Sequence, residues 1–164
     1  MMKLIDSGNW NHSKYEVFLD LNNEYKNLNI RTTGAAAICI TENEEVVLIN
    51  NEPLGGHLEN KETPVDTIKR EALEEGGFEI NKAKYFGFYK ITQSDTAEKK
   101  YKIKYPKLGL ILFFIAQGKI VSEPLDKRAG TRRIIPISKI KEDIEIKHKM
   151  LLEGIELYLS NLFL

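Results

Sequence analysis

Residues 56–78 read GHLENKETPVDTIKREALEEGGF, and this stretch predicts one helix with well-defined ends. Thr63 suits the N-cap of the helix, and Pro64 suits its first position because its fixed φ is already helical. Gly76 and Gly77 supply the left-handed stop that commonly ends a helix. The glycines before the helix allow the backbone to approach a ligand closely. The stretch therefore predicts a glycine loop followed by a capped helix.

Three glutamates gather on one face of that helix. Glu71, Glu74 and Glu75 stand at positions i, i+3 and i+4, which are neighbours on a helix surface. Like charges at this spacing repel each other, and a helix that needed only solubility would interleave lysines. A hard divalent cation, which prefers oxygen ligands, explains the cluster better. The alternative is a charged, solvated surface helix, and Glu74 and Glu75 alone would fit it.

The complete spacing resembles the Nudix box of the Nudix (MutT-like) hydrolase family. The fixed positions of the box are filled here by Gly56, Glu62, Arg70, Glu71, Ala72, Glu74, Glu75, Gly77 and Phe78. Gly55 fits the Gly-Gly start that commonly precedes the box. The order of the predicted elements extends the resemblance from about residue 30 to the C-terminus.

The resemblance implies a fold, an activity and a cofactor. The fold is an α/β one, the Nudix α/β/α sandwich, in which a mixed sheet has flanking helices. The activity is metal-dependent hydrolysis of the diphosphate linkage in a nucleoside diphosphate linked to another moiety. The expected cofactor is Mg²⁺, with Mn²⁺ as a substitute, because a divalent cation neutralises phosphate charge and activates water.

The resemblance also assigns roles within the box. Glu74 and Glu75 resemble the principal metal ligands, and Glu71 resembles a ligand or the base that acts on water. Gly55 would offer its backbone carbonyl to the metal. Arg70 would orient the glutamates by a charge-assisted contact. The expected metal ligands are thus Glu71, Glu74, Glu75 and Gly55, and the expected catalytic residues are Glu71, Glu74 and Arg70.

Other positions of the box region receive supporting roles. Gly56 and Gly77 are structural positions of the motif. Glu62 resembles the structural glutamate that steadies the loop, and it is not expected to be a catalyst. His57 lies in the glycine loop, where a contact to a substrate phosphate is plausible.

A later loop departs from the family. Many members carry an acidic residue there, as a further metal ligand or as the base, whereas residues 126–133 read DKRAGTRR and are basic. Glu123 and Asp126 are the nearest acids. We expect the base to come from the box and the loop's arginines to hold substrate phosphate, although they could merely solvate the loop. These candidate substrate-binding residues are Arg128, Arg132 and Arg133.

Length and composition are those of an ordinary globular protein. The chain has 164 residues, which is long enough for one domain with a core. Hydrophobic residues make up 42% of it and charged residues 29%, both ordinary for a globular protein. A formal net charge of zero gives no reason to expect nucleic acid or a membrane as partner. The single cysteine, Cys39, excludes an internal disulfide framework and is expected to be buried. No signal peptide is apparent, so we expect cytoplasmic residence.

Hydrophobic periodicity predicts the order of elements. Residues 1–29 are expected to form a helical N-terminal extension packed on a Nudix domain over residues 30–164. The expected elements are a helix at 13–26, a strand hairpin at 34–40 and 45–50, the box helix, strands at 83–92, 108–117 and 131–137, and a long amphipathic helix from Ile144 to Leu162. Within that last helix, His148 is expected to be a structural histidine.

Two classes of function stay open. The first is a hydrolase, with a nucleoside triphosphate or a nucleotide sugar as the favoured substrate. The second is a Nudix-like domain that senses a nucleotide without cleaving it. The complete glutamate set favours the enzyme, and the basic later loop favours the sensor.

A small-molecule nucleotide is the expected partner. A homodimer is possible, and Trp10 could cap the core or meet a partner chain. Residues 99–105 are expected to form an edge strand with lysines on one face; the alternative is a base-stacking tyrosine beside phosphate-binding lysines.

Overall fold

The structure, a computed structural model, describes residues 1–10, 13–93 and 106–160. Its elements in chain order are β1 (Met2–Trp10), β2 (Ser13–Asp20), the 3-10 helix η1 (Glu24–Leu28), β3 (Thr32–Thr41), β4 (Glu45–Ile49), β5 (Leu54–His57), α1 (Pro64–Gly76), β6 (Phe78–Gln93), β7 (Leu108–Ile120), β8 (Arg132–Pro136), the 3-10 helix η2 (Ile137–Glu142) and α3 (Lys149–Leu159).

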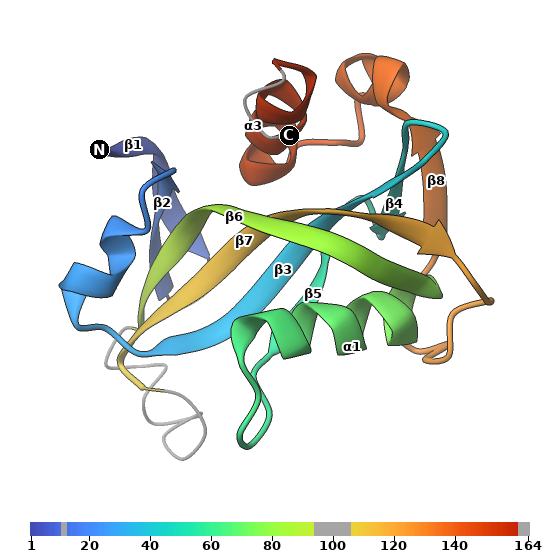
Figure 1. The fold of residues 1–164 in the computed structure, drawn as a ribbon. Coiled ribbons are helices and arrows are strands. Elements are labelled where there is room, and N and C mark those ends of the chain that lie inside the picture. Colours follow the sequence, from blue (N-terminus) through green and yellow to red (C-terminus); the bar gives the residue numbers. More distant parts are fainter. Residues whose placement is uncertain (11–12, 94–105, 161–164) are drawn as a thin grey trace.

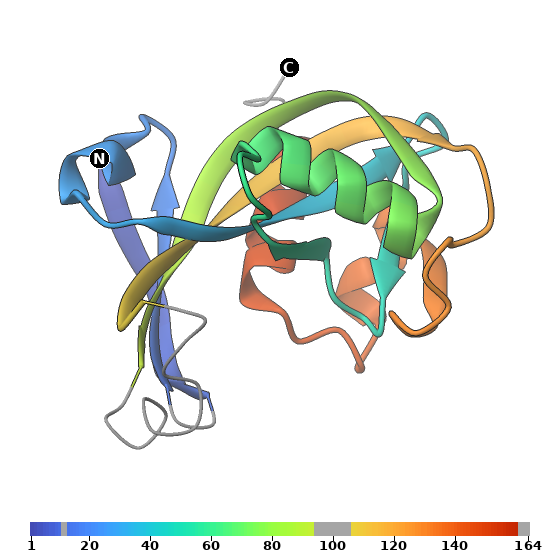
Figure 2. The same cartoon turned by 90° about the horizontal axis from the view of Figure 1, so that it is seen from below.

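One mixed sheet runs between two helical layers (Figures 1 and 2). Its strand order is β1-β2-β6-β7-β3-β4-β8, and β5 pairs with β3 off this path. Helix α1 covers one face of the sheet, while η2 and α3 lie on the other (Figure 1). The predicted α/β/α sandwich is confirmed.

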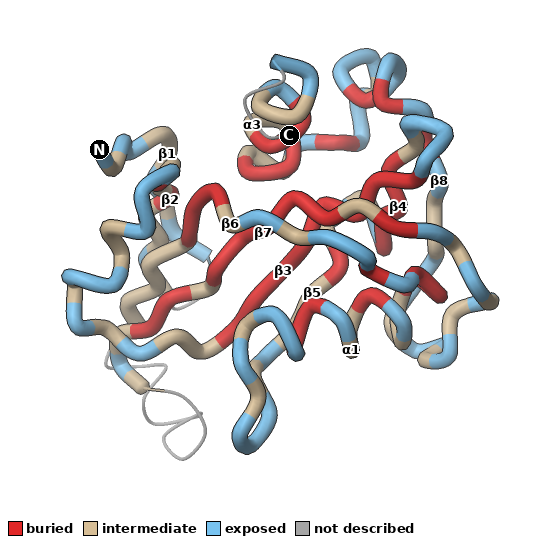
Figure 3. Tube along the Cα trace, viewed as in Figure 1, coloured by how far each residue is buried: buried red, intermediate tan, exposed pale blue. Residues whose placement is uncertain are grey.

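The central strands β3 and β7 are parallel and nearly continuously buried (Figure 3). Alternate side chains of β3 enter different cores, because successive residues of a strand point to opposite faces. Ala35 and Cys39 pack in the cluster that contains Ile68 of α1, whereas Ile38 packs in the cluster that contains Leu151 of α3. Cys39 is fully buried as expected, and burial raises the pKa of its thiol.

Most predicted elements of the second part of the chain are confirmed. Strands β3 and β4 form the expected antiparallel hairpin, in which Cys39 faces Val47. Strands β6 and β7 contain the strands expected at 83–92 and 108–117, and β8 lies within the strand expected at 131–137, although β6 begins five residues earlier than predicted. The strand expected at 99–105 lies outside the described residues.

The helix predicted at residues 13–26 is wrong, because this segment forms β2, a turn and η1. Strand β1, which was not predicted, pairs with β2, and β2 pairs with β6. The apolar residues of β2 mimic helical spacing because both of its faces are covered. Tyr15 and Leu19 pack on the cluster beneath α3, while Phe18 packs on the cluster beneath α1. The extension therefore consists of two strands and one short 3-10 helix, and its boundary at residue 29 stays a prediction.

Two further expectations need correction. The glycine loop before the helix is the short strand β5, in which Gly55 pairs with Ala36 of β3. The terminal helix is shorter than predicted: α3 begins at Lys149, and Ile144 precedes it with 87% of its surface exposed. The end of the predicted helix, residues 161–164, lies outside the described residues. Trp10 is 58% exposed on β1, so it does not cap the core.

His148 caps α3 and packs its ring on the sheet, as expected of a structural histidine. It is the N-cap of α3, where its Nδ1 accepts a hydrogen bond from the backbone N–H of Leu151 at 3.3 Å. Its ring stacks on Tyr89 with a centroid distance of 5.7 Å, and Tyr89 stacks on Tyr15 at 5.9 Å. These stacked rings connect the start of α3 to β6 and β2.

No helix among the residues described has the length and hydrophobicity to cross a bilayer.

The burial of His148 predicts a pH-dependent stability. Burial lowers the pKa of His148 from 6.5 to about 4, so the unfolded chain binds the additional proton between these values. The contribution of His148 to the free energy of unfolding is complete above pH 6.5, and it falls as the pH drops toward 4. We expect the free energy of unfolding to be about 2 kcal/mol lower at pH 5 than at pH 7.5 from this group alone.

Urea unfolding of the native chain and of His148→Asn at both pH values measures this effect. Asparagine keeps a good N-cap but does not titrate. The variant should therefore lose less stability than the native chain between pH 7.5 and pH 5. Equal losses in the two proteins would show that His148 does not carry this pH dependence.

Candidate active site

Helix α1 has the ends that its sequence predicts. Thr63 is the N-cap: its Oγ1 accepts from the backbone N–H of Asp66 at 3.2 Å, and the Asp66 carboxylate accepts from the Thr63 N–H at 2.9 Å. This is a capping box, which satisfies two otherwise unpaired donors. At the other end, Gly77 adopts the left-handed conformation with φ 60°. The local signals therefore fix which residues are helical and which face they present.

The inner face of α1 rests directly on the sheet. Ile68 and Ala72 are buried in the cluster with Leu54 of β5. A Cβ at Gly76 would lie 2.5 Å from Leu54 Cδ1, so glycine permits the close approach of the helix end. A Cβ at Gly55 would likewise lie 2.5 Å from the Ala36 backbone. Gly76 thus lets the helix end approach β5, and Gly55 lets β5 approach β3.

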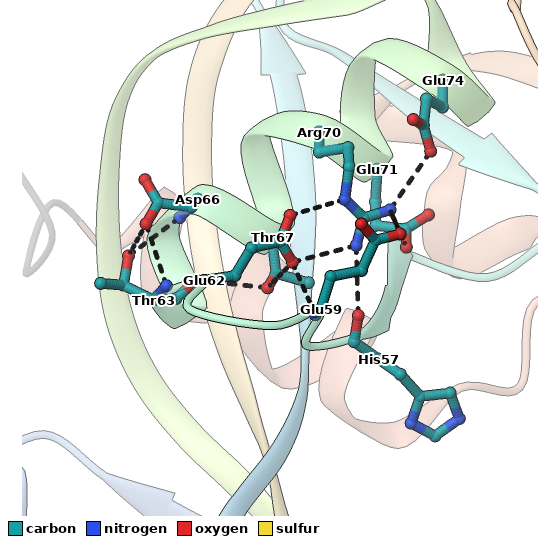
Figure 4. A network of polar contacts seen from close by, with 9 residues as sticks. All are labelled: His57, Glu59, Glu62, Thr63, Asp66, Thr67, Arg70, Glu71 and Glu74. Atoms are coloured by element: carbon teal, nitrogen blue, oxygen red, sulfur yellow. Dashed lines mark hydrogen bonds and ion pairs between the residues drawn. The ribbon is translucent and has the colours of Figure 1, made fainter.

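Arg70 is the centre of a polar network on the outer face of α1 (Figure 4). Its Nε donates to Glu62 Oε1 at 2.7 Å, and its Nη1 donates to Glu71 Oε1 at 2.7 Å and Glu74 Oε2 at 3.2 Å. Its Nη2 donates to the His57 carbonyl at 3.1 Å. One guanidinium therefore joins the loop after β5 to two of the clustered glutamates.

Glu62 connects this network to the loop. Its carboxylate accepts from the backbone N–H of Glu59 and from Thr67 Oγ1, both at 2.9 Å, in addition to Arg70. The hydrogen bond from Arg70 is the largest of the contributions that lower the pKa of Glu62 to about 2. Glu62 is thus held ionised by structural partners, which agrees with a residue that steadies the loop.

Glu75 lies on the side of the helix nearest β5. Its Oε2 accepts from the backbone N–H of Gly55 at 3.1 Å. Burial raises the pKa of Glu75 to about 7, and the charges of Glu71, Asp126 and Glu74 act in the same direction. Glu75 is therefore surrounded by other carboxylates in a partly desolvated place.

Gly56 makes room for Glu71. A Cβ at Gly56 would lie 2.2 Å from Glu71 Oε1, so any other residue would displace this carboxylate. The two glycines of β5 thus serve two different glutamates: Gly55 through a hydrogen bond and Gly56 through the absence of a side chain.

The chemistry of the donors suits a divalent cation. Glu71, Glu74 and Glu75 offer carboxylate oxygens, the ligands that Mg²⁺ prefers, and a cation would offset their mutual repulsion. In the part of the chain that the structure describes, however, no three acidic, histidine or cysteine side chains are arranged closely enough to hold a metal. Arg70 binds two of the three glutamates here, and Gly55 binds the third, so the donors are present but are engaged with the protein.

The later loop, which in the structure is residues 121–131 between β7 and β8, brings an additional acid to this site. The backbone N–H of Asp126 donates to the Glu74 carbonyl at 2.8 Å, and the Asp126 charge contributes to the raised pKa of Glu75. Hydrogen bonds from the backbone N–H and the guanidinium of Arg128 lower the pKa of Asp126. The sequence named Asp126 and Glu123 as the nearest acids but did not show which of them reaches the helix, because no local pattern aligns the loop with the helix. The other candidate, Glu123, has 88% of its side-chain surface exposed and pairs with Arg132.

The structure separates the predicted substrate-binding residues. Arg128 has 93% of its side-chain surface exposed beside Asp126. Arg132 is bound by the helix end and the later loop, and Arg133 pairs with Asp143 at 2.6 Å. The His57 carbonyl meets Arg70, while its imidazole points away from that arginine (Figure 4). Contact of these four residues with substrate stays a prediction, and Arg132 and Arg133 already have internal partners.

Comparison with known proteins places the chain in a family. A sequence model described as the NUDIX domain matches residues 31–152. The chain therefore belongs to the Nudix family, and the predictions of this family and of a Nudix-type hydrolase are confirmed. No curated protein sequence matches the chain.

Solved structures share the fold at low sequence identity. The pyrophosphohydrolase BsRppH from Bacillus subtilis is 15% identical with a TM-score of 0.67, and the match covers 98% of this chain and 100% of that one. A Nudix-family hydrolase from Clostridium perfringens is 18% identical with a TM-score of 0.52, covering 78% of this chain and 98% of that one. A MutT structure from work on Aliivibrio salmonicida and Vibrio cholerae is 16% identical with a TM-score of 0.52, covering 79% and 98%.

Proposed function

We propose that the chain is a metal-dependent hydrolase that cleaves the diphosphate linkage of a nucleoside diphosphate linked to another moiety. A nucleoside triphosphate or a nucleotide sugar is the favoured substrate, and Mg²⁺ or Mn²⁺ the cofactor. The observation that carries this proposal is the row Glu71, Glu74 and Glu75 on α1, held beside the two glycines of β5. A solvated surface helix would not need a half-buried glutamate that binds a strand N–H.

The residues of the site would have different roles in the reaction. Glu71, Glu74 and Glu75 would hold the cation, which when bound offsets phosphate charge and makes water a better nucleophile. Arg70 keeps Glu71 and Glu74 in place by ion pairs. Glu71 is the proposed base, because Arg70 holds its carboxylate in a restricted geometry. Arg128, whose exposed side chain lies beside Asp126, is the arginine best placed to meet a substrate phosphate.

The extent of the structural likeness supports a pyrophosphohydrolase. The match to the Bacillus pyrophosphohydrolase covers 98% of the chain, so it includes the N-terminal strands, whereas the Clostridium and MutT matches cover 78% and 79%. The first of these structures therefore shares more of the architecture. This favours release of pyrophosphate or phosphate from a nucleotide over nucleotide sensing. A small-molecule nucleotide remains the proposed partner, and the cytoplasm the proposed location.

A nucleotide panel tests the function. We expect release of pyrophosphate or phosphate from at least one nucleoside triphosphate or nucleotide sugar with Mg²⁺ or Mn²⁺, and no release in excess chelator, because the carboxylates alone cannot offset phosphate charge. Product identification by chromatography would define the bond that breaks. Undiminished turnover in excess EDTA would contradict the metal-dependent mechanism. Tight binding of a nucleotide without turnover would support the sensor.

A further inference from the structure

We propose that Arg132 is a positioning residue that fixes the last turn of α1, which carries Glu74 and Glu75, by tying it to the later loop and to β8. This inference rests on the proposed function and replaces the expectation that Arg132 binds substrate phosphate. It is carried by the contacts of one largely buried guanidinium with the end of the helix.

The guanidinium of Arg132 donates to protein acceptors through both of its Nη atoms. Its Nη1 donates to the carbonyl oxygens of Gly76 and Ser122, both at 2.9 Å. Its Nη2 donates to both carboxylate oxygens of Glu123 at 3.1 Å. Only 14% of the side-chain surface is exposed. A guanidinium in this state is a structural cross-link and offers little to an incoming phosphate.

The Gly76 carbonyl is one that a helix cannot satisfy by itself. The last carbonyls of an α-helix lack intrahelical donors, and the negative end of the helix dipole favours a cation there. Helix α1 has no basic residue in its own last turn. Arg132 supplies that cation from β8, where its backbone pairs with Ile49 of β4. The helix end is thereby anchored to the edge of the sheet.

The later loop is docked on the same turn by its backbone. The N–H groups of Val121 and Ser122 donate to the Gly77 carbonyl at 2.8 and 3.2 Å, and the Asp126 N–H donates to the Glu74 carbonyl at 2.8 Å. A Cβ at Gly77 would lie 2.0 Å from the Ser122 oxygen, so the fit is tight. Arg132 binds the same Ser122 oxygen and closes this arrangement.

The far end of the loop is held independently. The side chain of Asn50 donates to the Ala129 carbonyl at 3.2 Å and accepts from the Thr131 N–H at 3.0 Å. Loss of Arg132 should therefore release the part of the loop near Ser122 and the turn with Glu74 and Glu75, while the rest stays folded. Arg132 thus acts on the reaction through the position of two glutamates.

Arg132→Met tests the proposal, because methionine keeps much of the apolar stem but donates no hydrogen bond. We expect kcat to fall roughly tenfold to a hundredfold, the scale of a displaced catalytic group, with KM within about twofold. Arg132→Lys should recover part of kcat. Glu123→Gln is the matched control: it weakens the exposed ion pair but leaves both carbonyl contacts of Arg132, so its kcat should stay close to native.

Hydrogen exchange gives a readout that does not need turnover. In Arg132→Met, exchange should rise in residues 121–126 and in the last turn of α1, and should stay native in the first turn of α1. Unchanged exchange there, or a raised KM with native kcat, would overturn the proposal and return Arg132 to the substrate. If the native chain turned over no nucleotide, the proposed function would fail, and the exchange data would still decide whether Arg132 fixes this turn.

Discussion

Replacing Glu75 by glutamine is expected to reduce turnover by roughly a hundredfold or more while the fold survives. The Glu75 carboxylate is one of the three proposed cation ligands, and metal-assisted charge stabilisation is worth several kcal/mol, of which each 1.4 kcal/mol is a factor of ten. Glutamine keeps the shape and can still accept the hydrogen bond from Gly55. Glu74→Gln should give a loss of similar size. Initial rates with saturating Mg²⁺ measure both.

The same change should leave the thermal midpoint equal to the native one or slightly higher. Burial and the neighbouring carboxylates make the ionised form of Glu75 unfavourable, so removing its charge relieves repulsion. Glu79→Gln is a matched control, because Glu79 is an exposed glutamate of β6 paired only loosely with Lys119. Its rate should be native. Near-native rates in both Glu74→Gln and Glu75→Gln would remove these residues from the proposed metal site.

The box helix could be predicted from the sequence because its determinants are local. The capping box joins Thr63 to Asp66, three residues apart, and Gly77 ends the helix by its own backbone conformation. The glutamate face follows from helical spacing alone. The contacts of Arg70 with Glu71 and Glu74 are equally local and follow from the helix. These parts of the site therefore need no knowledge of the rest of the fold.

The other parts depend on contacts between distant segments. Strand β2 could not be recognised from its own pattern, since its register is set by β1 and β6 and both of its faces are covered. Arg132 reaches a carbonyl 56 residues away, and Asp126 reaches the backbone of Glu74 only because the loop docks on the helix. Charge alone predicted a phosphate clamp in this region, and the sequence could not show that Arg132 and Arg133 have protein partners, because those partners lie in other segments.

The second large effect is expected from replacing the proposed general base, Glu71. Glu71→Gln should reduce kcat by roughly a hundredfold or more, the usual scale for a lost general base. Asp126→Asn and Glu123→Gln should be mild. Hydrogen bonds from Arg128 lower the pKa of Asp126, which makes it a weak proton acceptor, and Glu123 is exposed and paired with Arg132. Asparagine at 126 also keeps the backbone N–H that binds Glu74.

The shape of the pH–rate profile separates loss of the base from loss of the metal. Each variant is measured with Mn²⁺ titrated to saturation, so that a weaker cation site appears as a shifted metal dependence. A true loss of the base removes the acidic limb of the kcat profile at saturating metal. We expect this only for Glu71→Gln. If the kcat profile of Asp126→Asn lacked the acidic limb while its Mn²⁺ affinity stayed native, the base would lie in the later loop. Arg128, which sets the pKa of Asp126, would then tune catalysis and not bind phosphate.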